Sequence, residues 1–370
     1  MEAYRRYIWV NSLSGFLYFF VLISPFYAAE RGIELPQAGW IFGAVFAIQA
    51  FLSYTVGKVF EKLPPSWGII TGRAIYSLGP LILAFESGIW WFAVAQIAAS
   101  FFDVFFPSIV LYERAIIPPD RREEIYRKLI VASEGVKIAF LVFFVLSYLR
   151  GWDVYRAVFL SMFTTSIVYI LSFVFFLPRV RSGMEGASEF HDKRSLLFIY
   201  LSQLFTFLSF NFASWMIISY YLKEVLGGKN IDIVYFEFFF SVPIVLTYPV
   251  LSRVSSRLSL RVKFFTGGVV MAGYFFFMMI PRMWAFYLAH VFLGVGFPVW
   301  LPAKETLKFQ AAPAELGRWE GFFQGVNIFS RIVFPPISAY LAQSVSYAFV
   351  FLIGGLMAGL GALMALGVRE

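Results

Sequence analysis

Five ionisable residues lie inside long apolar runs of this sequence, and their chemistry stands out from their surroundings. Glu134 and Lys137 lie three residues apart in VASEGVKIAFLVFF, Asp103 lies in FFDVFF, Glu237 in VYFEFFF and Arg331 in NIFSRIVFPP. A charged group at the centre of a bilayer costs about 2.5–3.5 kcal/mol on insertion scales, so such groups are usually paired and often functional. Carboxylates at that depth can carry protons, and an arginine, which stays charged at physiological pH, can bind a carboxylate or a phosphate.

The positions of these residues predict one cluster of charges. Glu134 and Lys137 can touch, because residues three apart share a helix face. At about 1.5 Å per residue, Lys137 and Asp103 both lie roughly 14 Å into the membrane, on consecutive antiparallel helices. We therefore expect an Asp103–Lys137–Glu134 cluster with one surplus negative charge. The cluster serves either proton coupling or a structural role. In the structural alternative, the Glu134 side chain reaches partly toward the membrane interface.

Arg331 lies near the middle of its expected helix and has no acid near it in sequence. It either contacts an anionic group of a substrate or pairs with a distant residue, for which Glu237 and Gln49 are candidates. Asn327 lies four residues from Arg331, on the same helix face. The proton-coupling candidates are Asp103, Glu134, Lys137 and Glu237. The candidates for a substrate cavity are Asn11, Gln49, Asn211, Gln324, Asn327 and Arg331, although each amide can instead form a helix–helix hydrogen bond.

Other kinds of chemistry have little support in the sequence. There is no cysteine, and the two histidines are His191, in a polar segment, and His290, for which a hydrogen-bonded structural role is favoured. We therefore expect no metal site and no cofactor. The absence of a phosphate-binding GxxxxGK[ST] motif argues against ATP-driven transport. No nucleophile motif appears, so the protein is not expected to be an enzyme.

The elements that position these residues are membrane-spanning helices. Of the 370 residues, 60% are hydrophobic and 14% are charged, whereas soluble domains are about 25% charged. A helix needs about 20 apolar residues to cross the hydrocarbon core. The sequence predicts an all-α membrane protein with twelve such spans, at 7–29, 36–57, 67–86, 88–112, 128–149, 155–178, 195–221, 232–252, 262–281, 283–303, 319–341 and 345–367.

The basic residues predict how the chain is oriented in the membrane. Of the 30 lysines and arginines, 22 fall on one side, Arg73 among them, and 6 on the other, whereas Lys137 and Arg331 fall inside spans. Since cytoplasmic loops are rich in lysine and arginine, both termini are expected in the cytoplasm. The same distribution accounts for the net charge of +8 without a nucleic-acid partner.

The chain is expected to consist of two six-helix bundles, 1–178 and 195–370, joined by a cytoplasmic linker at 179–194. A weak internal repeat supports this division. VGKVFEKL at 56–63 aligns with LSRVSSRL at 251–258, and Thr71-Gly72 aligns with Thr266-Gly267 at the same offset. The loops after spans four and ten share a proline and a charge pair, Glu113-Arg114 and Lys304-Glu305. Parallel repeats of this kind occur in membrane transporters.

With this architecture, and with GKVFEK at 57–62, the chain resembles the major facilitator superfamily of secondary transporters. The resemblance covers the whole length and implies alternating access of a central site to the two membrane faces. It also implies a cytoplasmic gate in which Gly57, Glu61 and Lys62 match the family's loop between helices two and three. Leu63-Pro64-Pro65 replaces the second glycine and the basic cluster of that motif. VASEGVKIAFLVFF lacks the proline and most of the glycines of the fifth helix in many proton-coupled exporters.

The function expected from these features is secondary active transport of a small organic solute across the cell membrane, coupled to protons. The expected partners are a small-molecule substrate, the lipid bilayer and protons, with no nucleic acid, and the protein is expected to be a monomer. Two alternatives stay open: an uncoupled facilitator, and a non-transporting membrane protein on the same fold, such as a sensor or a lipid-handling scaffold.

Overall fold

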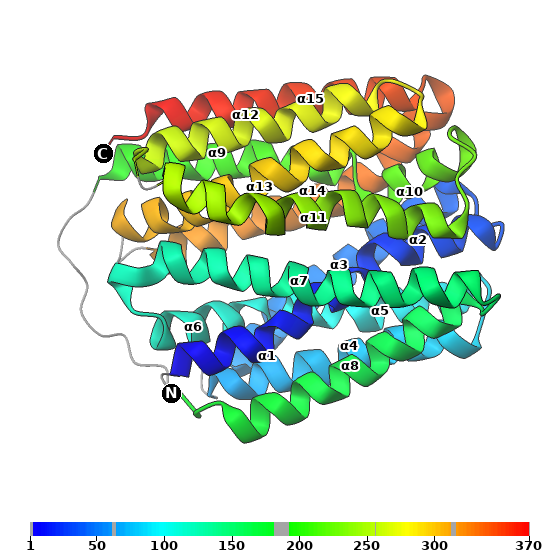
Figure 1. Cartoon of the computed structure of the whole chain (residues 1–370), viewed down its shortest axis with the longest axis horizontal. Helices are drawn as coiled ribbons and strands as arrows, with labels where there is room; N and C mark the ends of the chain where they lie inside the picture. Colours follow the sequence, from blue (N-terminus) through cyan, green and yellow to red (C-terminus); the bar gives the residue numbers. More distant parts are fainter. Residues whose placement is uncertain (1–2, 61–63, 181–191, 256, 312–315, 370) are drawn as a thin grey trace.

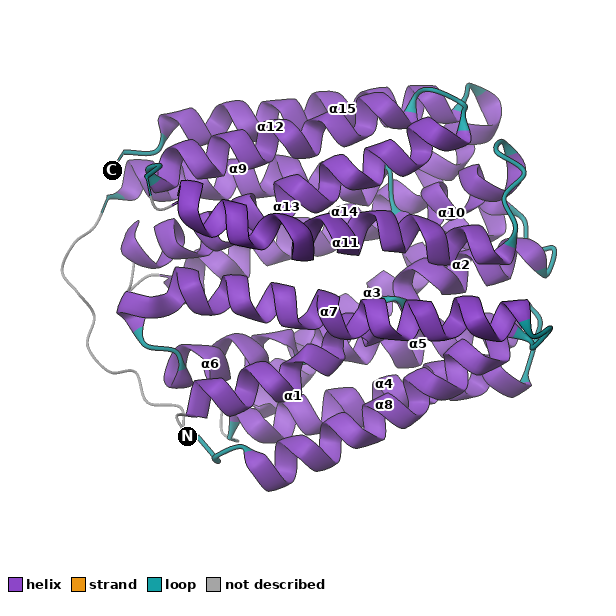
Figure 2. Ribbon diagram, in the orientation of Figure 1, coloured by secondary structure: helices purple, strands orange, loops and turns teal. Residues whose placement is uncertain are grey.

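The protein is built from long α-helices that run along one common axis (Figures 1 and 2). The computed structural model describes residues 3–60, 64–180, 192–255, 257–311 and 316–369. The first part of the chain forms α1 (Ala3–Tyr18), α2 (Phe20–Glu30), α3 (Leu35–Phe60), α4 (Pro65–Phe85), α5 (Ile89–Val104), α6 (Phe106–Ile116), the 3-10 turn η1 (Pro119–Arg121), α7 (Arg122–Leu149) and α8 (Val154–Phe176). The second part forms α9 (Lys193–Phe212), α10 (Trp215–Glu224), α11 (Asn230–Ser255), α12 (Leu260–Met278), α13 (Met283–Ala311), α14 (Leu316–Ser344), α15 (Tyr347–Met364) and the 3-10 turn η2 (Ala365–Gly367).

Three of the predicted spans are each made of two helices that meet at a break. The breaks fall at Phe19 between α1 and α2, at Phe105 between α5 and α6, and at 213–214 between α9 and α10. Pro107 explains the second break, because proline has no N–H to donate to the carbonyl of residue 103 four positions earlier. Asp103 therefore lies on the last turn of α5, beside an irregular part of the backbone.

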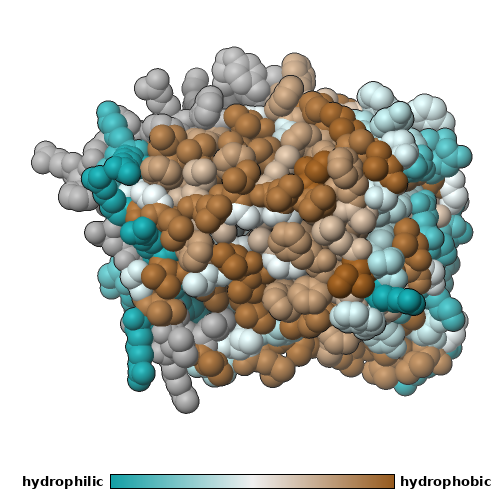
Figure 3. Space-filling view, turned by 90° about the horizontal axis from the view of Figure 1, so that it is seen from above, coloured by the Kyte–Doolittle hydropathy of each residue, from teal (hydrophilic) through white to brown (hydrophobic). Residues whose placement is uncertain are grey.

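The helices have the length and composition of membrane spans. Within the described residues, eleven helical segments are long and apolar enough to cross a bilayer. The helix α14, which covers the predicted span 319–341, is not among the eleven. In Figure 3 a hydrophobic band covers the middle of the visible face, and hydrophilic residues gather toward the two ends. These features indicate a multi-pass membrane protein whose helices run across the bilayer.

Helices from the two parts of the chain contact each other along their lengths. In Figure 1 most helices before residue 181 lie in the lower part of the view and those after residue 191 in the upper part, with α2 beside α10. Packing contacts join α3 to α14, α7 to α11 and α13, and α2 to α10. The first contact is close: a Cβ atom on Gly43 would lie 2.9 Å from the carbonyl oxygen of Ile332, and one on Gly39 would lie 3.0 Å from that of Pro335. Small residues allow this approach, as is common between membrane helices.

Both chain termini lie at the same end of the molecule in Figure 1, called here the terminal end. The loop that joins α2 to α3 and the loop that joins α10 to α11 lie at the opposite end, called here the far end. These names describe position in the molecule alone.

Candidate functional site

Asp103 and Arg331 form an ion pair between α5 and α14, across the two parts of the chain. The Nη2 atom of Arg331 donates to Oδ2 of Asp103 at 2.9 Å, although the residues are 228 positions apart in sequence. The Arg331 side chain is 25% exposed and that of Asp103 is 34% exposed. The partner of Arg331 is therefore neither Glu237 nor Gln49, the candidates that the sequence suggested. Because both side chains are accessible, a small molecule can reach this pair without a rearrangement of the core.

The exposed part of this pair faces away from the apolar surface of its own helices. At 3.6 residues per turn, Arg331 lies about 200° around α14 from Phe329, a largely exposed phenylalanine. Asp103 lies about 180° around α5 from the exposed Val94. Because lipid contacts the exposed apolar side of a membrane helix, the ion pair faces the space between helices.

Aromatic rings from two other helices, α1 and α3, lie beside the ion pair. The guanidinium of Arg331 lies 4.0 Å from the centre of the Phe46 ring on α3. The Tyr18 ring, on α1, packs edge-on against Phe102, the neighbour of Asp103, with 5.5 Å between ring centres. Tyr18 is partly exposed and lies within electrostatic reach of Asp103. The aromatic carbon beside this accessible pair therefore comes from the first part of the chain, whereas Arg331 comes from the second.

Lys137 forms a second ionic contact between the two parts, and its composition differs from the prediction. The Lys137 ammonium donates to Glu134 on its own helix, α7, at 2.7 Å, and to Glu237 on α11. The side chains of Lys137, Glu134 and Glu237 are 4%, 10% and 2% exposed. The predicted Glu134–Lys137 contact exists, whereas Asp103 is not part of this cluster and Glu237 takes its place. The expected surplus of one negative charge is the same, because one carboxylate replaces another.

Helix packing explains why the prediction chose the wrong acid. Asp103 and Lys137 were placed together because their helices follow each other in sequence. In the structure α5 packs mainly against α3 and α4, whereas α7 packs against α1 and α11. Consecutive helices need not be neighbours, so equal depth in the membrane does not imply contact.

Three polar residues of the second part form a hydrogen-bonded group near Arg331. The Asn211 amide on α9 donates to Oδ1 of Asn327 at 2.8 Å and to the Ser330 hydroxyl at 2.7 Å, both on α14. Asn211 and Asn327 were predicted cavity residues, and the structure brings them together one turn from Arg331. Ser330 was not predicted.

The other predicted cavity residues lie apart from this group. On α1, Asn11 accepts a hydrogen bond from the Ser14 hydroxyl at 3.2 Å. Gln49 is buried in α3, and its amide oxygen has no hydrogen-bond partner within the described residues. Gln324 lies in α14, at a position where the side chain is outside the described part of the structure. Glu61, Lys62 and His191 also lie outside the described residues, and only the backbone of Gly57, in α3, is described.

His290 is a buried residue of α13 with a local partner. Its Nδ1 atom lies 2.7 Å from the backbone carbonyl oxygen of Phe286, one turn earlier, so Nδ1 is the protonated nitrogen. The rings of Phe236, Tyr274 and Phe286 pack around it. This geometry agrees with a hydrogen-bonded structural role.

Arg73 is an intramembrane charge that the sequence reasoning placed wrongly among the loop residues. It lies inside α4, its side chain is buried, and its guanidinium donates to the Ser14 hydroxyl at 3.2 Å. The rings of Phe102, Tyr76 and Tyr169 lie 4.1–5.2 Å from it, and none of the ion pairs between described residues includes it. The signal was available, because Arg73 lies seven residues into the predicted span 67–86.

More contacts join the two parts of the chain near each end of the molecule. At the terminal end, Lys263 on α12 lies 2.9 Å from Glu123 on α7. At the far end, the Tyr220 hydroxyl on α10 donates to the carbonyl of Ile33 at 2.7 Å. The Ser219 hydroxyl donates to the carbonyl of Leu22 at 3.1 Å. Any motion that separates the two parts at one end must break the contacts there.

Half-buried acids and buried lysines also lie toward the terminal end. Glu113 on α6 accepts a hydrogen bond from Tyr7 at 2.7 Å. On α13, Glu305 lies 2.8 Å from Lys304 and 2.9 Å from Lys308. The sequence comparison of the two loops had singled out the Glu113 and Lys304-Glu305 positions as repeat matches and had not assigned them a role.

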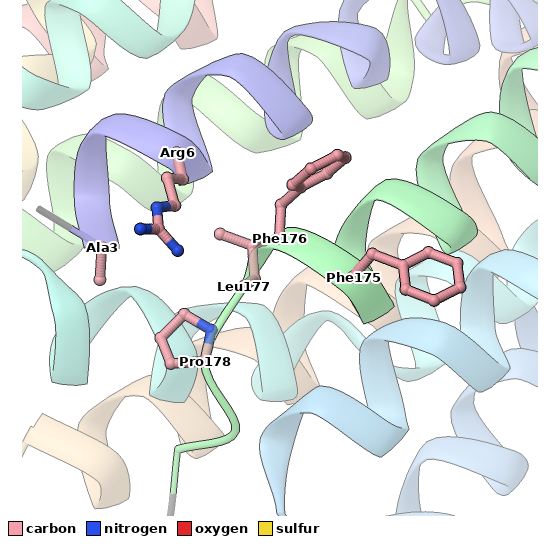
Figure 4. Close-up of a pocket in the computed structure, with 6 residues that line it drawn as sticks. All are labelled: Ala3, Arg6, Phe175, Phe176, Leu177 and Pro178. Carbon is pink, nitrogen blue, oxygen red and sulfur yellow. The ribbon is translucent and has the colours of Figure 1, made fainter. Parts of the chain in front are cut away.

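Two cavities near the surface do not include the residues described above. One, of about 340 Å³, lies at the terminal end between α1 and the end of α8 and contains Arg6 (Figure 4). The other, of about 400 Å³, lies between α1, α7 and α8 and is lined by Ser161, Thr164, Thr165 and apolar side chains. Neither contains a predicted site residue.

Comparison with known proteins identifies the architecture. The sequence model of the Major Facilitator Superfamily matches residues 8–237 and 199–370. The fold is similar to the crystal structure of the human organic anion transporter MFSD10 (TETRAN), with a TM-score of 0.68 and 11% sequence identity, over 99% of this chain and 100% of that chain. No individual curated protein matches the chain in sequence. The match to the family model, over nearly the whole length, shows that this chain belongs to the major facilitator superfamily.

Proposed function

We propose that this protein is a secondary active transporter that moves a small organic solute across the cell membrane by alternating access, with protons as the coupling ion. The observation that carries the proposal is the Asp103–Arg331 ion pair. It joins the two parts of the chain, lies inside the membrane-spanning region and is partly exposed. A purely structural ion pair in a membrane protein gains most when it is fully enclosed, so accessible charges at this depth favour a functional site.

The proposed moving parts are two six-helix bundles, residues 1–178 and 195–370, with both termini in the cytoplasm. The weak repeat between the two sequence halves and the excess of basic residues on one side support this arrangement. The contacts at the terminal end and at the far end would then open alternately. Gly57, Glu61 and Lys62 would belong to the cytoplasmic gate.

The proposed proton carriers are the intramembrane carboxylates. Glu134 and Glu237 share the single ammonium of Lys137, so the fully ionised group has one surplus negative charge. Desolvation disfavours that state, and binding one proton would remove the surplus. Asp103 is the third candidate and the only one of the three that is substantially exposed.

Uptake into proteoliposomes tests the proposal. The purified full chain would be reconstituted and assayed with a panel of radiolabelled organic anions, cations and neutral compounds, with and without an imposed pH gradient. Organic anions come first in the panel, because the similar solved structure is that of an organic anion transporter. Accumulation of a compound above its outside concentration, only with the gradient, is the expected result.

The same assay distinguishes the alternatives. Equal equilibration with and without the gradient would indicate an uncoupled facilitator. Absence of uptake for the whole panel, from a protein that unfolds cooperatively on heating and is therefore folded, would contradict transport and favour a sensor or a lipid-handling scaffold.

A further inference from the structure

We propose that an organic anion binds Arg331 in place of Asp103, and that the displaced Asp103 carboxylate takes up one proton. This assigns to the site a substrate class, a carboxylate attached to an apolar or aromatic body, and a reason for proton coupling. The inference rests on the proposed function.

The ion pair leaves most of its hydrogen-bonding capacity unused. A guanidinium has five N–H donors in a planar fork. Arg331 makes one hydrogen bond to Asp103 and contacts the Phe46 ring. The Oδ2 atom of Asp103 accepts that bond, and within the described residues Oδ1 has no partner. Asp103 therefore holds Arg331 through a single bond in the present geometry.

A free carboxylate can hold the same guanidinium better. Arginine and a carboxylate form two parallel hydrogen bonds when their planes align, which adds both strength and specificity. Asp103 is fixed to the last turn of α5, beside the break at Phe105, and reaches Arg331 with one oxygen. A diffusible anion has no such constraint, so it can compete for Arg331 even though Asp103 is always present.

Charge balance predicts what happens to Asp103. The pair is neutral in this structure, with one negative and one positive charge. An anion that replaced Asp103 on Arg331 would leave the Asp103 carboxylate without a partner in a partly desolvated site, which disfavours its ionised form. One proton from water on Asp103 restores neutrality: a neutral carboxyl group, one guanidinium and one bound anion.

The groups that face Asp103 do not offer it another strong partner. They are Arg331 on α14, Tyr18 on α1, and Arg73 and Tyr76 on α4. Arg73 is buried and is covered by the Phe102 ring, whose centre lies 4.1 Å from the guanidinium carbon. Among the described residues, an Asp103 carboxylate displaced from Arg331 therefore has no other ion-pair partner.

The lining of the site points to the rest of the ligand. Phe46, Tyr18 and Phe102 place aromatic rings beside the ion pair. Flat apolar groups pack well against such rings and gain from being removed from water. An aromatic carboxylate fits both features. A small inorganic anion would use only the guanidinium.

Binding of 2-naphthoate to the purified full chain in detergent tests the inference. Isothermal titration calorimetry would compare it with 2-naphthamide, which has the same ring system and no charge. A pH-indicator dye in weak buffer would count the protons taken up. We expect naphthoate binding in preference to naphthamide, about one proton taken up per naphthoate, and tighter binding as pH falls.

Two variants separate ligand exchange from a structural role. Asp103→Asn removes the competing carboxylate, so it should bind naphthoate about tenfold more tightly, a change typical of one charged hydrogen bond. Naphthoate binding to this variant should take up no proton. Arg331→Gln should weaken binding at least about thirtyfold, as for loss of one member of a desolvated charge pair. Arg282→Gln, at an exposed arginine of the far end, is the matched control and should bind as the parent does. Thermal unfolding of each variant identifies any that is misfolded.

Each contrary result has a defined meaning. Four results would overturn the exchange. They are equal binding of naphthoate and naphthamide, unchanged binding in Arg331→Gln, weaker binding in Asp103→Asn, and binding without proton uptake. If proteoliposomes transport a neutral compound while naphthoate does not bind, the inference fails and the proposed function stands. If naphthoate binds with proton uptake and no compound is transported, the exchange stands and the proposed function fails.

Discussion

Two ionic groups join the two parts of this chain inside the membrane, and they differ both in solvent access and in composition. Lys137 bonds Glu134 and Glu237 between α7 and α11, with the three side chains between 2% and 10% exposed. Arg331 bonds Asp103 between α14 and α5, with the two side chains 25% and 34% exposed. The first group uses its cation for two carboxylates, and the second uses its cation for one.

This difference suggests different roles. A buried charge that loses its partner is strongly destabilising, so the Lys137 group must change protonation state or move with its helices. An accessible charge that loses its partner can be compensated by water, by a proton or by a ligand. The Lys137 group is suited to proton binding or to holding helices, and the Asp103–Arg331 pair is suited to partner exchange.

The largest loss of stability is expected from Lys137→Met. This change leaves Glu134 and Glu237 together without a cation, and loss of one member of a buried ion pair typically destabilises a protein by about 3–5 kcal/mol. Thermal unfolding in detergent at neutral pH would measure it. The loss should shrink at lower pH, because protonation removes the two unpaired charges.

A matched set of variants checks the reason for that loss. Lys137→Arg keeps the positive charge and should lose much less stability. The triple variant Glu134→Gln, Lys137→Met and Glu237→Gln has no buried charge in this group and should recover most of the difference. If Lys137→Met unfolds at the parent temperature, the Lys137 group is not the buried ion pair described above.

A smaller effect on stability is expected from Asp103→Asn. Because solvent reaches both members of the pair, its loss should change stability by about 1 kcal/mol or less, as for accessible ion pairs. If Asp103→Asn destabilises the protein as much as Lys137→Met does in the same unfolding assay, the two ionic groups do not differ in the way described.

Asn211→Leu measures the contribution of an uncharged contact between α9 and α14 to stability. It removes two hydrogen bonds from Asn211 to Asn327 and Ser330 and keeps the number and branching of the side-chain heavy atoms. Hydrogen bonds between membrane helices contribute about 0.6 kcal/mol each on average, so we expect a loss of about 1 kcal/mol in the thermal assay. A loss as large as that of Lys137→Met would show that neutral polar contacts matter as much as the buried charges.

The smallest effect is expected at Asp192, a carboxylate just before the membrane-spanning α9. Its side chain accepts hydrogen bonds from the Ser195 hydroxyl and from the backbone N–H groups of Arg194 and Ser195, and these bonds lower the pKa of Asp192. Because the folded-state pKa lies below the unfolded value, the ionised Asp192 carboxylate contributes to the stability of the fold above the unfolded pKa. This contribution is lost as pH falls through the folded pKa.

Asp192→Ala removes this helix cap and should destabilise the protein by less than about 1 kcal/mol at neutral pH. Asp192→Asn keeps a capping oxygen and is the control, with a contribution that should not vary with pH. A difference between the parent and the alanine variant that stays constant well below pH 4 would contradict the assigned ionisation.

Some of the site could be predicted from the sequence. The Glu134–Lys137 contact followed from their spacing on one helix, and the exceptional position of Arg331 followed from the apolar run around it. Asp103 was identified as a residue of interest and was assigned to the wrong partner. Arg73 was overlooked because its charge was counted with the loops, although its position inside an apolar run was visible.

The sequence by itself determined that the chain is a helical membrane protein and placed five of its charges inside apolar runs. The reason is that membrane insertion depends on local hydropathy, a property that any stretch of about 20 residues carries in itself. Only the tertiary structure decided that Arg331 pairs with Asp103, that Lys137 pairs with Glu237, and that the first pair is open and the second buried. Partner choice depends on which helix faces pack together, and the residues of those faces lie 100 and 228 positions apart in the chain.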